Sequence, residues 1–265
     1  MHPKTEELLY ILLWTCESLS QPTVRNLTES FESWAYRSGL LRQIRELEHK
    51  GLIERTSPPP QRGKRVDRLV RLTESGRLHA LHGRDPEARW NREWDGQWRL
   101  VLYDLPAVDG TRRNRVRNAL RSRGFGWLQD SVWISPDPVT ELVASLDENP
   151  SDVESLLFLE ARPAGGESDR DIVAGAWNFE AIHQRYTRYL KVLARLPAKW
   201  SGSESDAEHL RQWLALERAA WSEAVRSDPL LPRRLWPEGY PAPQALRQRL
   251  ERLAVAGERM RSFRP

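Results

Sequence analysis

The chain has 265 residues and a formal net charge of +4, with an isoelectric point near 9.4. The length predicts two or three domains, and the positive charge fits nucleic-acid binding. With one cysteine, Cys16, the chain lacks a disulfide framework and a cysteine-based zinc site. No segment reaches the roughly eighteen apolar residues of a membrane span. The apolar run at 8–14 follows two glutamates rather than a basic leader, so we expect a soluble, cytoplasmic protein.

The N-terminal part of the chain has the periodicity of three helices. Apolar residues recur at helical spacing in residues 5–17, in a short segment beginning at Pro22, and from Leu40 to Leu47, where Gly51 is positioned as a C-cap. A DNA recognition helix needs an apolar inner face and hydrogen-bond donors on its outer face. The candidate donors on or just before the third helix are Arg37, Ser38, Arg42, Gln43 and Arg45.

Two short strands are predicted after the third helix. Residues 52–55 and 68–72 flank a polar, proline-rich loop whose tip carries Arg62, Lys64 and Arg65. A hairpin with a basic tip reaches DNA phosphates or the minor groove. Three helices followed by this hairpin predict a winged helix-turn-helix DNA-binding domain over residues 1–85. A winged helix used for protein contacts is the alternative.

A polar linker that contains Trp90 and Trp94 is expected over residues 83–95, and a second domain is predicted over residues 96–165. Strands and helices alternate there in the order strand, helix, strand, strand, helix, strand, at residues 97–105, 111–124, 125–129, 132–135, 138–148 and 153–162. This βαββαβ order within about seventy residues predicts a ferredoxin-like domain. Outward arginines on its first helix either form a second nucleic-acid surface or are neutralised by neighbouring carboxylates.

The remaining residues, 170–265, predict an α-helical third domain. One apolar and aromatic helical stripe runs from Ile172 to Leu196, a second helix covers 206–226, and a proline-rich connection leads to a final amphipathic helix. Such helices suit dimerisation or a lid over a pocket. The twelve tryptophans of the chain fit domain interfaces, a ligand pocket or plain core packing. The expected fold class is therefore multidomain α+β.

The segment from Tyr103 to Ser135 ends in GFGWLQDSVWIS and resembles the Cas2 endoribonuclease-like fold. The resemblance implies an aspartate at the end of the first strand that is associated with a divalent metal in a dimer, and Asp104 occupies this position. Carboxylate oxygens suit Mg²⁺, but one carboxylate per subunit is a sparse ligand set. Asp104 also fits a residue that caps the following turn, and this structural role is the favoured interpretation.

Six segments share a wider resemblance: RELEHKGLIER, RLTESG, WDGQWRLVL, GFGWLQDSVWIS, IVAGAWNFEAIHQRYTRYL and SDPLLPRRLWPEGYPA. Together they resemble the PaaX family of bacterial repressors along almost the whole chain. The resemblance implies a homodimer that binds a palindromic double-stranded DNA operator and is released by an aryl-CoA such as phenylacetyl-CoA. It implies no cofactor beyond this effector. Residues 18–34 differ from the family pattern in that region.

The expected function is therefore a DNA-binding transcriptional regulator without enzymatic activity. Two alternatives stay open. One is a metal-dependent nuclease that acts through Asp104 and uses the winged helix for targeting, although the sequence offers Asp104 no evident second carboxylate, histidine or lysine in a catalytic arrangement. The other is a regulator of a defence or CRISPR-type locus that binds DNA without a small ligand.

Overall fold

The computed structural model describes residues 5, 6, 8, 9, 12, 40–56, 69–80, 84–103, 110–140, 142 and 156–262. The chain divides into two compact units. The first comprises residues 1–85, 186–222 and 242–265, and the second comprises residues 86–185 and 223–241. Within the described residues, no helix is both long and apolar enough to cross a membrane.

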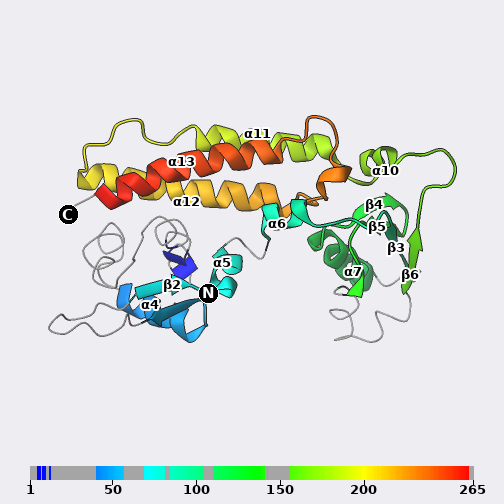
Figure 1. Cartoon of the computed structure of the whole chain (residues 1–265), viewed down its shortest axis with the longest axis horizontal. Coiled ribbons are helices and arrows are strands. Elements are labelled where there is room, and N and C mark those ends of the chain that lie inside the picture. The colour runs from blue at the N-terminus through cyan, green and yellow to red at the C-terminus, as the bar shows by residue number, and fades with distance from the viewer. Residues whose placement is uncertain are drawn as a thin grey trace. The chain divides into compact units, whose positions relative to one another are not determined.

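Of the first unit, the described residues between Leu40 and Ala80 form a helix, a hairpin and a short helix (Figure 1). The elements are α4 (Leu40–His49), β1 (Ile53–Thr56), β2 (Leu69–Leu72) and α5 (Glu74–Ala80). The strands pair antiparallel with Ile53 opposite Leu72, and Ile44 and Leu47 of α4 are fully buried. These findings confirm the predicted third helix and both strands, while the second helix and the loop between the strands lie outside the described residues.

Local hydrogen bonds fix the connections of this part. At the end of α4, Gly51 has φ 65°, and the N–H of Leu52 donates to the carbonyl of Leu47 at 2.9 Å, as in a Schellman motif. This confirms Gly51 as the C-cap. Thr73 caps α5 by accepting from the N–H of Gly76 at 2.9 Å, and its hydroxyl donates to the Gly51 carbonyl at 2.7 Å.

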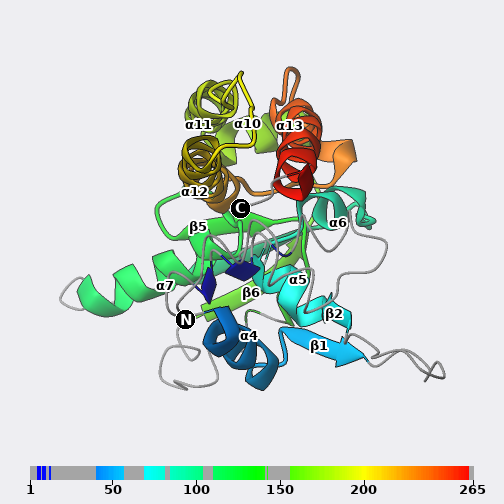
Figure 2. The ribbon, with the colours of Figure 1, turned by 90° about the vertical axis from the view of Figure 1, so that its left-hand side faces the viewer.

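The helical part of the first unit is built from three long helices that run alongside one another (Figures 1 and 2). They are α11 (Phe179–Leu193), α12 (Glu204–Arg226) and α13 (Ala242–Ser262). The second and final predicted helices are thereby confirmed. The single stripe predicted between residues 172 and 196 is instead two helices, α10 (Asp169–Ala176) and α11. The chain leaves the helical conformation at Trp177, where φ is −127° and ψ is 139°.

A buried ion pair joins α12 to α13. Glu217 and Arg249 are 0% and 1% exposed, and Arg249 Nε lies 2.7 Å from a Glu217 carboxylate oxygen. The same oxygen accepts the hydroxyl of Tyr189 at 2.8 Å, and the guanidinium stacks 4.5 Å from the centre of the Trp221 ring. Each charge is therefore compensated where water is excluded, as a buried ion requires.

The second unit contains a four-stranded antiparallel sheet in the order β4–β5–β3–β6. Its strands are β3 (Trp98–Tyr103), β4 (Gly126–Gln129), β5 (Val132–Ser135) and β6 (Leu156–Ala161), and helix α7 (Gly110–Ser122) connects the first two. All four predicted strands and the first helix of the βαββαβ unit are confirmed. The second predicted helix, 138–148, lies largely outside the described residues.

The sheet has an apolar core on each face, because neighbouring residues of a strand point to opposite sides. Helix α7 covers the face that contains Val101 and Trp133. Helix α10 and the short η1 (Arg233–Leu235) cover the other face, which contains Trp98 and Ile134. Figure 1 shows α7 and α10 on opposite sides of the strands.

The segment before β3, expected to be a linker, contains the short helix α6 (Pro86–Asn91). Its Trp90 is 3% exposed and donates its indole N–H to the Tyr240 hydroxyl at 3.3 Å. That hydroxyl donates to Asp228 at 2.7 Å, and Asp228 also accepts the N–H of Leu230 at 2.8 Å. The Asp-Pro-Leu-Leu-Pro segment is thus a hydrogen-bonded loop, in which Leu230 has φ 51°.

Candidate nucleic-acid interface and pocket

Helix α4 presents two arginines to solvent. Arg42 and Arg45 are exposed, whereas Gln43 is half-buried. The amide oxygen of Gln43 is covered and has no hydrogen-bond partner within the described part of the chain. Of the three predicted recognition residues on this helix, Arg42 and Arg45 therefore have the most freely accessible donors.

The acidic residues of α4 are engaged elsewhere. Glu46 accepts the Thr5 hydroxyl at 3.0 Å and pairs with Lys50 at 3.2 Å. The hydrogen bond from Lys50, followed by that from Thr5, lowers the pKa of Glu46 below its ordinary value. Glu48 pairs with Arg55 of β1 at 2.9 Å. Both carboxylates are thus held by other partners, which leaves Arg42 and Arg45 as the outward basic charges of the helix.

The other sequence-predicted site residues lie outside the described residues. They are Arg37, Ser38, Arg62, Lys64, Arg65 and Asp104. Within the described residues, no group of three or more histidine, cysteine, aspartate or glutamate side chains could hold a metal ion.

Arginines of α7 and of the turn that follows it contact their own domain. Arg117 donates to the Tyr103 hydroxyl at 3.1 Å, and Arg123 donates to the carbonyl of Ala119 at 3.2 Å. Arg121 is exposed and stacks over Trp133, with 5.6 Å between the guanidinium carbon and the ring centre. Arg121 therefore differs from the other two arginines, because it contacts an aromatic ring whereas they donate to oxygen atoms of the same domain.

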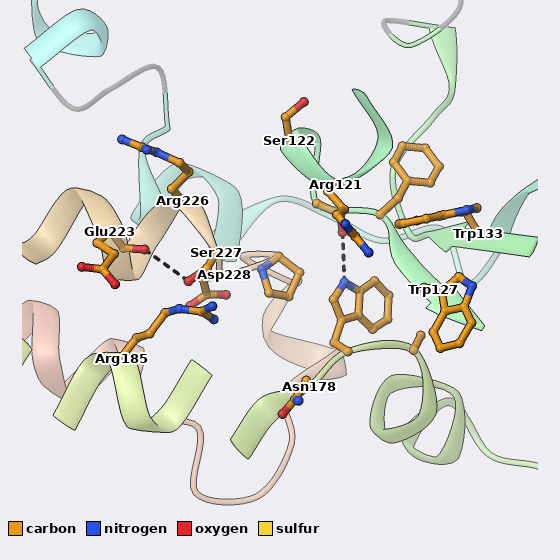
Figure 3. A pocket seen from close by; sticks show the side chains of 15 residues that line it. Arg121, Ser122, Trp127, Trp133, Asn178, Arg185, Glu223, Arg226, Ser227 and Asp228 are labelled. Carbon is orange, nitrogen blue, oxygen red and sulfur yellow. Dashed lines mark hydrogen bonds between the residues drawn. The ribbon is translucent and has the colours of Figure 1, made fainter. Parts of the chain in front are cut away.

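Arg121 lies at a cavity of about 540 Å³ within the second unit (Figure 3). Segments far apart in the sequence meet there: the end of α7, strands β4 and β5, the α10–α11 junction and the end of α12. The lining residues are Arg121, Ser122, Gly124, Phe125, Trp127, Trp133, Ala176, Trp177, Asn178, Arg185, Glu223, Arg226, Ser227, Asp228 and Pro229.

Three tryptophans form much of the cavity wall. The side chain of Trp177 is fixed because its indole N–H donates to the Gly124 carbonyl at 3.1 Å. Trp127 is 50% exposed, and its indole N–H donates to the Asp130 carbonyl at 3.1 Å. Trp133 is 1% exposed and lies under Arg121. The wall thus offers fixed aromatic surface, part of which faces solvent.

Three arginines and two carboxylates line the cavity. The guanidinium groups of Arg121 and Arg185 make no ion pair or hydrogen bond with the described residues. The Asp228 carboxylate is already engaged by Tyr240 and Leu230. In Figure 3, Arg185 extends from α11 toward Ser227 and Asp228. Three arginines against two carboxylates leave the lining with a formal excess of one positive charge, beside aromatic rings.

Comparison with known proteins identifies the middle of the chain. Residues 91–173 match the family described as the PaaX protein central Cas2-like domain. The chain contains a PaaX central Cas2-like domain. This domain includes the sheet, α7 and the first half of α10, and it supplies the cavity residues from Arg121 to Trp133. The remaining lining residues lie just beyond the matched part or much later in the chain.

The fold beyond this PaaX domain has a counterpart among solved structures. The uncharacterized protein Rv0674 from Mycobacterium tuberculosis matches with a TM-score of 0.56 and 20% sequence identity. The match covers 96% of this chain and 95% of that chain. The two proteins therefore share a fold along nearly their whole lengths. No curated protein matches the sequence.

Sequence reasoning did not find the cavity. Its residues come from separate segments that only the folded chain brings together, and the one available signal was the abundance of tryptophan. The arginines of α7 were noted as a group, but Arg121 could not be distinguished from its neighbours without the contact to Trp133.

Proposed function

We propose that this protein is a DNA-binding transcriptional regulator, and specifically a repressor. The observation that carries the proposal is the outer face of α4, where Arg42 and Arg45 are exposed while Glu46 and Glu48 pair with other residues. Exposed guanidiniums on a helix that precedes a hairpin fit a recognition helix in the major groove. The PaaX central domain supports a PaaX-like regulator.

The proposed active form is a homodimer on a palindromic operator. A two-fold axis between two copies places two recognition helices on half-sites one helical turn apart, about 34–36 Å. In this arrangement Arg37, Ser38, Arg42, Gln43 and Arg45 serve the major groove, and Arg62, Lys64 and Arg65 serve phosphates or the minor groove. Five of these residues lie outside the described part of the chain, so only the sequence supports their role: Arg37, Ser38, Arg62, Lys64 and Arg65.

An aryl-CoA-like effector is proposed to release the repressor from DNA. A ligand shifts a protein between two states only when it binds one state more tightly. The effector would therefore favour a dimer geometry in which the two recognition helices no longer fit both half-sites. Titration of phenylacetyl-CoA into the protein–operator complex tests this part. An operator complex that survives saturating thioester would instead support a regulator without this ligand.

The DNA-binding proposal is tested by selecting duplexes from a random library with the purified protein. The selected site is then titrated with an Arg42→Ala, Gln43→Ala double variant by fluorescence anisotropy. Each lost base contact is expected to cost about 1–3 kcal/mol. Arg195→Ala, an exposed arginine on the turn after α11, serves as the control and is expected to bind as the wild type does. Equal affinity of the double variant would contradict the placement of α4.

The proposal excludes catalysis, and a cleavage assay tests that part. Purified protein is incubated with single-stranded RNA and with duplex DNA in the presence of Mg²⁺. A non-enzymatic regulator leaves both intact. Cleavage that disappears in Asp104→Asn would favour the Cas2-like nuclease function instead, because the carboxylate would then be needed to hold the metal.

A further inference from the structure

We propose that the cavity beside Arg121 binds a small aromatic anion in which a planar ring and a negatively charged group lie close together. Nothing in the DNA-binding proposal requires such a site. One cavity contains both fixed indole rings and the guanidiniums of Arg121 and Arg185, which have no ion-pair partner among the described residues. The inference rests on this combination.

The positive charge in the cavity is adjacent to an aromatic surface. The guanidinium carbon of Arg121 lies 5.6 Å from the centre of the Trp133 ring, a cation–π arrangement that holds the side chain over the indole. This contact leaves the N–H donors of Arg121 available. A carboxylate or phosphate accepts two such donors at once, and this planar match is why arginine is favoured at anion sites.

A second guanidinium is present on the α11 side of the cavity. Arg185 is half-buried and has no ion pair or hydrogen bond to the described residues. The nearby carboxylate of Asp228 already accepts from Tyr240 and Leu230. An anionic ligand would give Arg121 and Arg185 the partners that the described residues do not supply.

The walls fit a flat ring. Trp127 leaves half of its surface exposed, although its polar atom is already bonded to Asp130, so its exposed ring offers stacking surface rather than a hydrogen bond. Stacked or edge-on contacts with such a ring stabilise a bound aromatic ligand beyond the burial of its area. The volume of about 540 Å³ lies within the range of roughly 300–1,000 Å³ that small-molecule sites occupy.

This arrangement discriminates between ligand chemistries. In an aryl-CoA the aryl ring is next to a neutral thioester, and the adenine and phosphates are at the far end of a long arm. In an aromatic carboxylate or a nucleotide, including the nucleotide end of CoA, the charge belongs to the same compact body as a ring, which suits a cavity lined by both Arg121 and the half-exposed ring of Trp127. The site thus favours a compact aromatic anion. Its role as an effector site rests on the proposed function, but binding is measured without DNA.

The test is isothermal titration calorimetry of the full-length protein with two aromatic anions, benzoate and AMP. Cyclohexanecarboxylate keeps the charge without a planar ring, and benzamide keeps the ring without the charge. The variants are Arg121→Gln and Arg185→Gln. Arg188→Gln, an exposed arginine of α11 outside the cavity, is the matched control. Circular dichroism confirms that each variant is folded.

The proposal predicts that benzoate or AMP binds at least tenfold more tightly than cyclohexanecarboxylate and benzamide. Each cavity variant is expected to weaken this binding about tenfold, whereas Arg188→Gln leaves it unchanged. Preference for benzoate assigns the anion to a carboxylate, and preference for AMP assigns it to a phosphate. Absence of binding by both anions, or binding unaffected in folded Arg121→Gln and Arg185→Gln variants, overturns the proposal. Neither result alters the test of DNA binding.

Discussion

Gly126 of β4 lies so close to Trp177 that no larger residue fits between them. A Cβ on Gly126 would lie 2.6 Å from Cε2 of the indole and 2.7 Å from the Cβ of Ala176. The glycine therefore allows the end of α10 to lie directly on β4. Because Trp177 also bonds to Gly124, this contact sets the position of one wall of the cavity.

Gly126→Ala is therefore expected to destabilise the second unit by about 1–3 kcal/mol, the usual cost of overpacking. Urea denaturation monitored by tryptophan fluorescence measures the change. Gly175→Ala is the matched control, because Gly175 lies in α10 with no atom within 4 Å of an added Cβ. That control should be neutral or slightly stabilising. Equal stability of Gly126→Ala and the wild type would show that the end of α10 does not pack directly against Gly126 of β4.

Loss of one partner of the buried pair Glu217–Arg249 is expected to lower the free energy of unfolding strongly. Glu217→Gln leaves the Arg249 guanidinium buried without a counter-charge and should cost about 3–5 kcal/mol. On the same helix, Glu208→Gln removes a partly exposed pair with Arg211 and should cost at most about 1 kcal/mol. Denaturation curves of the two variants give the comparison. Similar small losses in both would contradict the burial of the pair.

The hydrogen bonds to Asp95 are expected to make the stability of the protein depend on pH. The hydrogen bond from Arg99, and to a smaller extent the one from the N–H of Gln97, lowers the pKa of Asp95 below its ordinary value of 3.8. A carboxyl group with a lowered folded-state pKa contributes stability above its unfolded pKa and loses it as the pH falls through the folded pKa.

Asp95→Asn should therefore reduce the unfolding free energy at neutral pH, and its difference from the wild type should shrink as the pH falls below 3.8. Denaturation midpoints of both proteins, measured from pH 7 downward, follow this difference. If the difference in stability between the two proteins stays constant across this pH range, or increases at low pH, the result would argue against the pairing of Asp95 with Arg99.

Thr73 is expected to stabilise the junction between the hairpin and α5. Thr73→Val removes the hydroxyl that accepts from Gly76 and donates to Gly51, and loss of an N-cap costs about 0.5–2 kcal/mol. Thr73→Ser keeps the hydroxyl and should retain most of the stability. Hydrogen exchange of the amides in α5 and β2 reports the local effect. Equal protection in the valine and serine variants would rule out the cap.

The elements that the sequence predicted correctly have local signals. Gly51 ends α4 because a left-handed residue is needed there, and the strands of the sheet follow from apolar runs between turns. The break between α10 and α11 had one local signal, Asn178, whose side chain accepts the N–H of Ala181 at 2.9 Å as an N-cap does. Apolar spacing continues through Trp177, so the stripe resembles one helix until the contact with Gly126 and the bond to Gly124 are known.

The two candidate sites also differ in whether a local sequence pattern indicates them. Arg42 and Arg45 could be predicted because one helix carries them, and helical periodicity assigns a face to each residue. The cavity could not be predicted, since Arg121 is more than fifty residues before Trp177 and Arg185 in the sequence and meets them only through the packing of α10 on the sheet. Trp90 of α6 was likewise assigned to a linker although it is buried.

The most direct test of the central claim is the enrichment of genomic DNA fragments by the purified protein, followed by sequencing. A DNA-binding regulator is expected to enrich a small set of fragments that share an inverted repeat with half-sites about one helical turn apart. The Arg42→Ala, Arg45→Ala variant should lose this enrichment, and Arg195→Ala should keep it. Fragments recovered without any shared sequence, or identical recovery by the Arg42→Ala, Arg45→Ala variant, would contradict the claim.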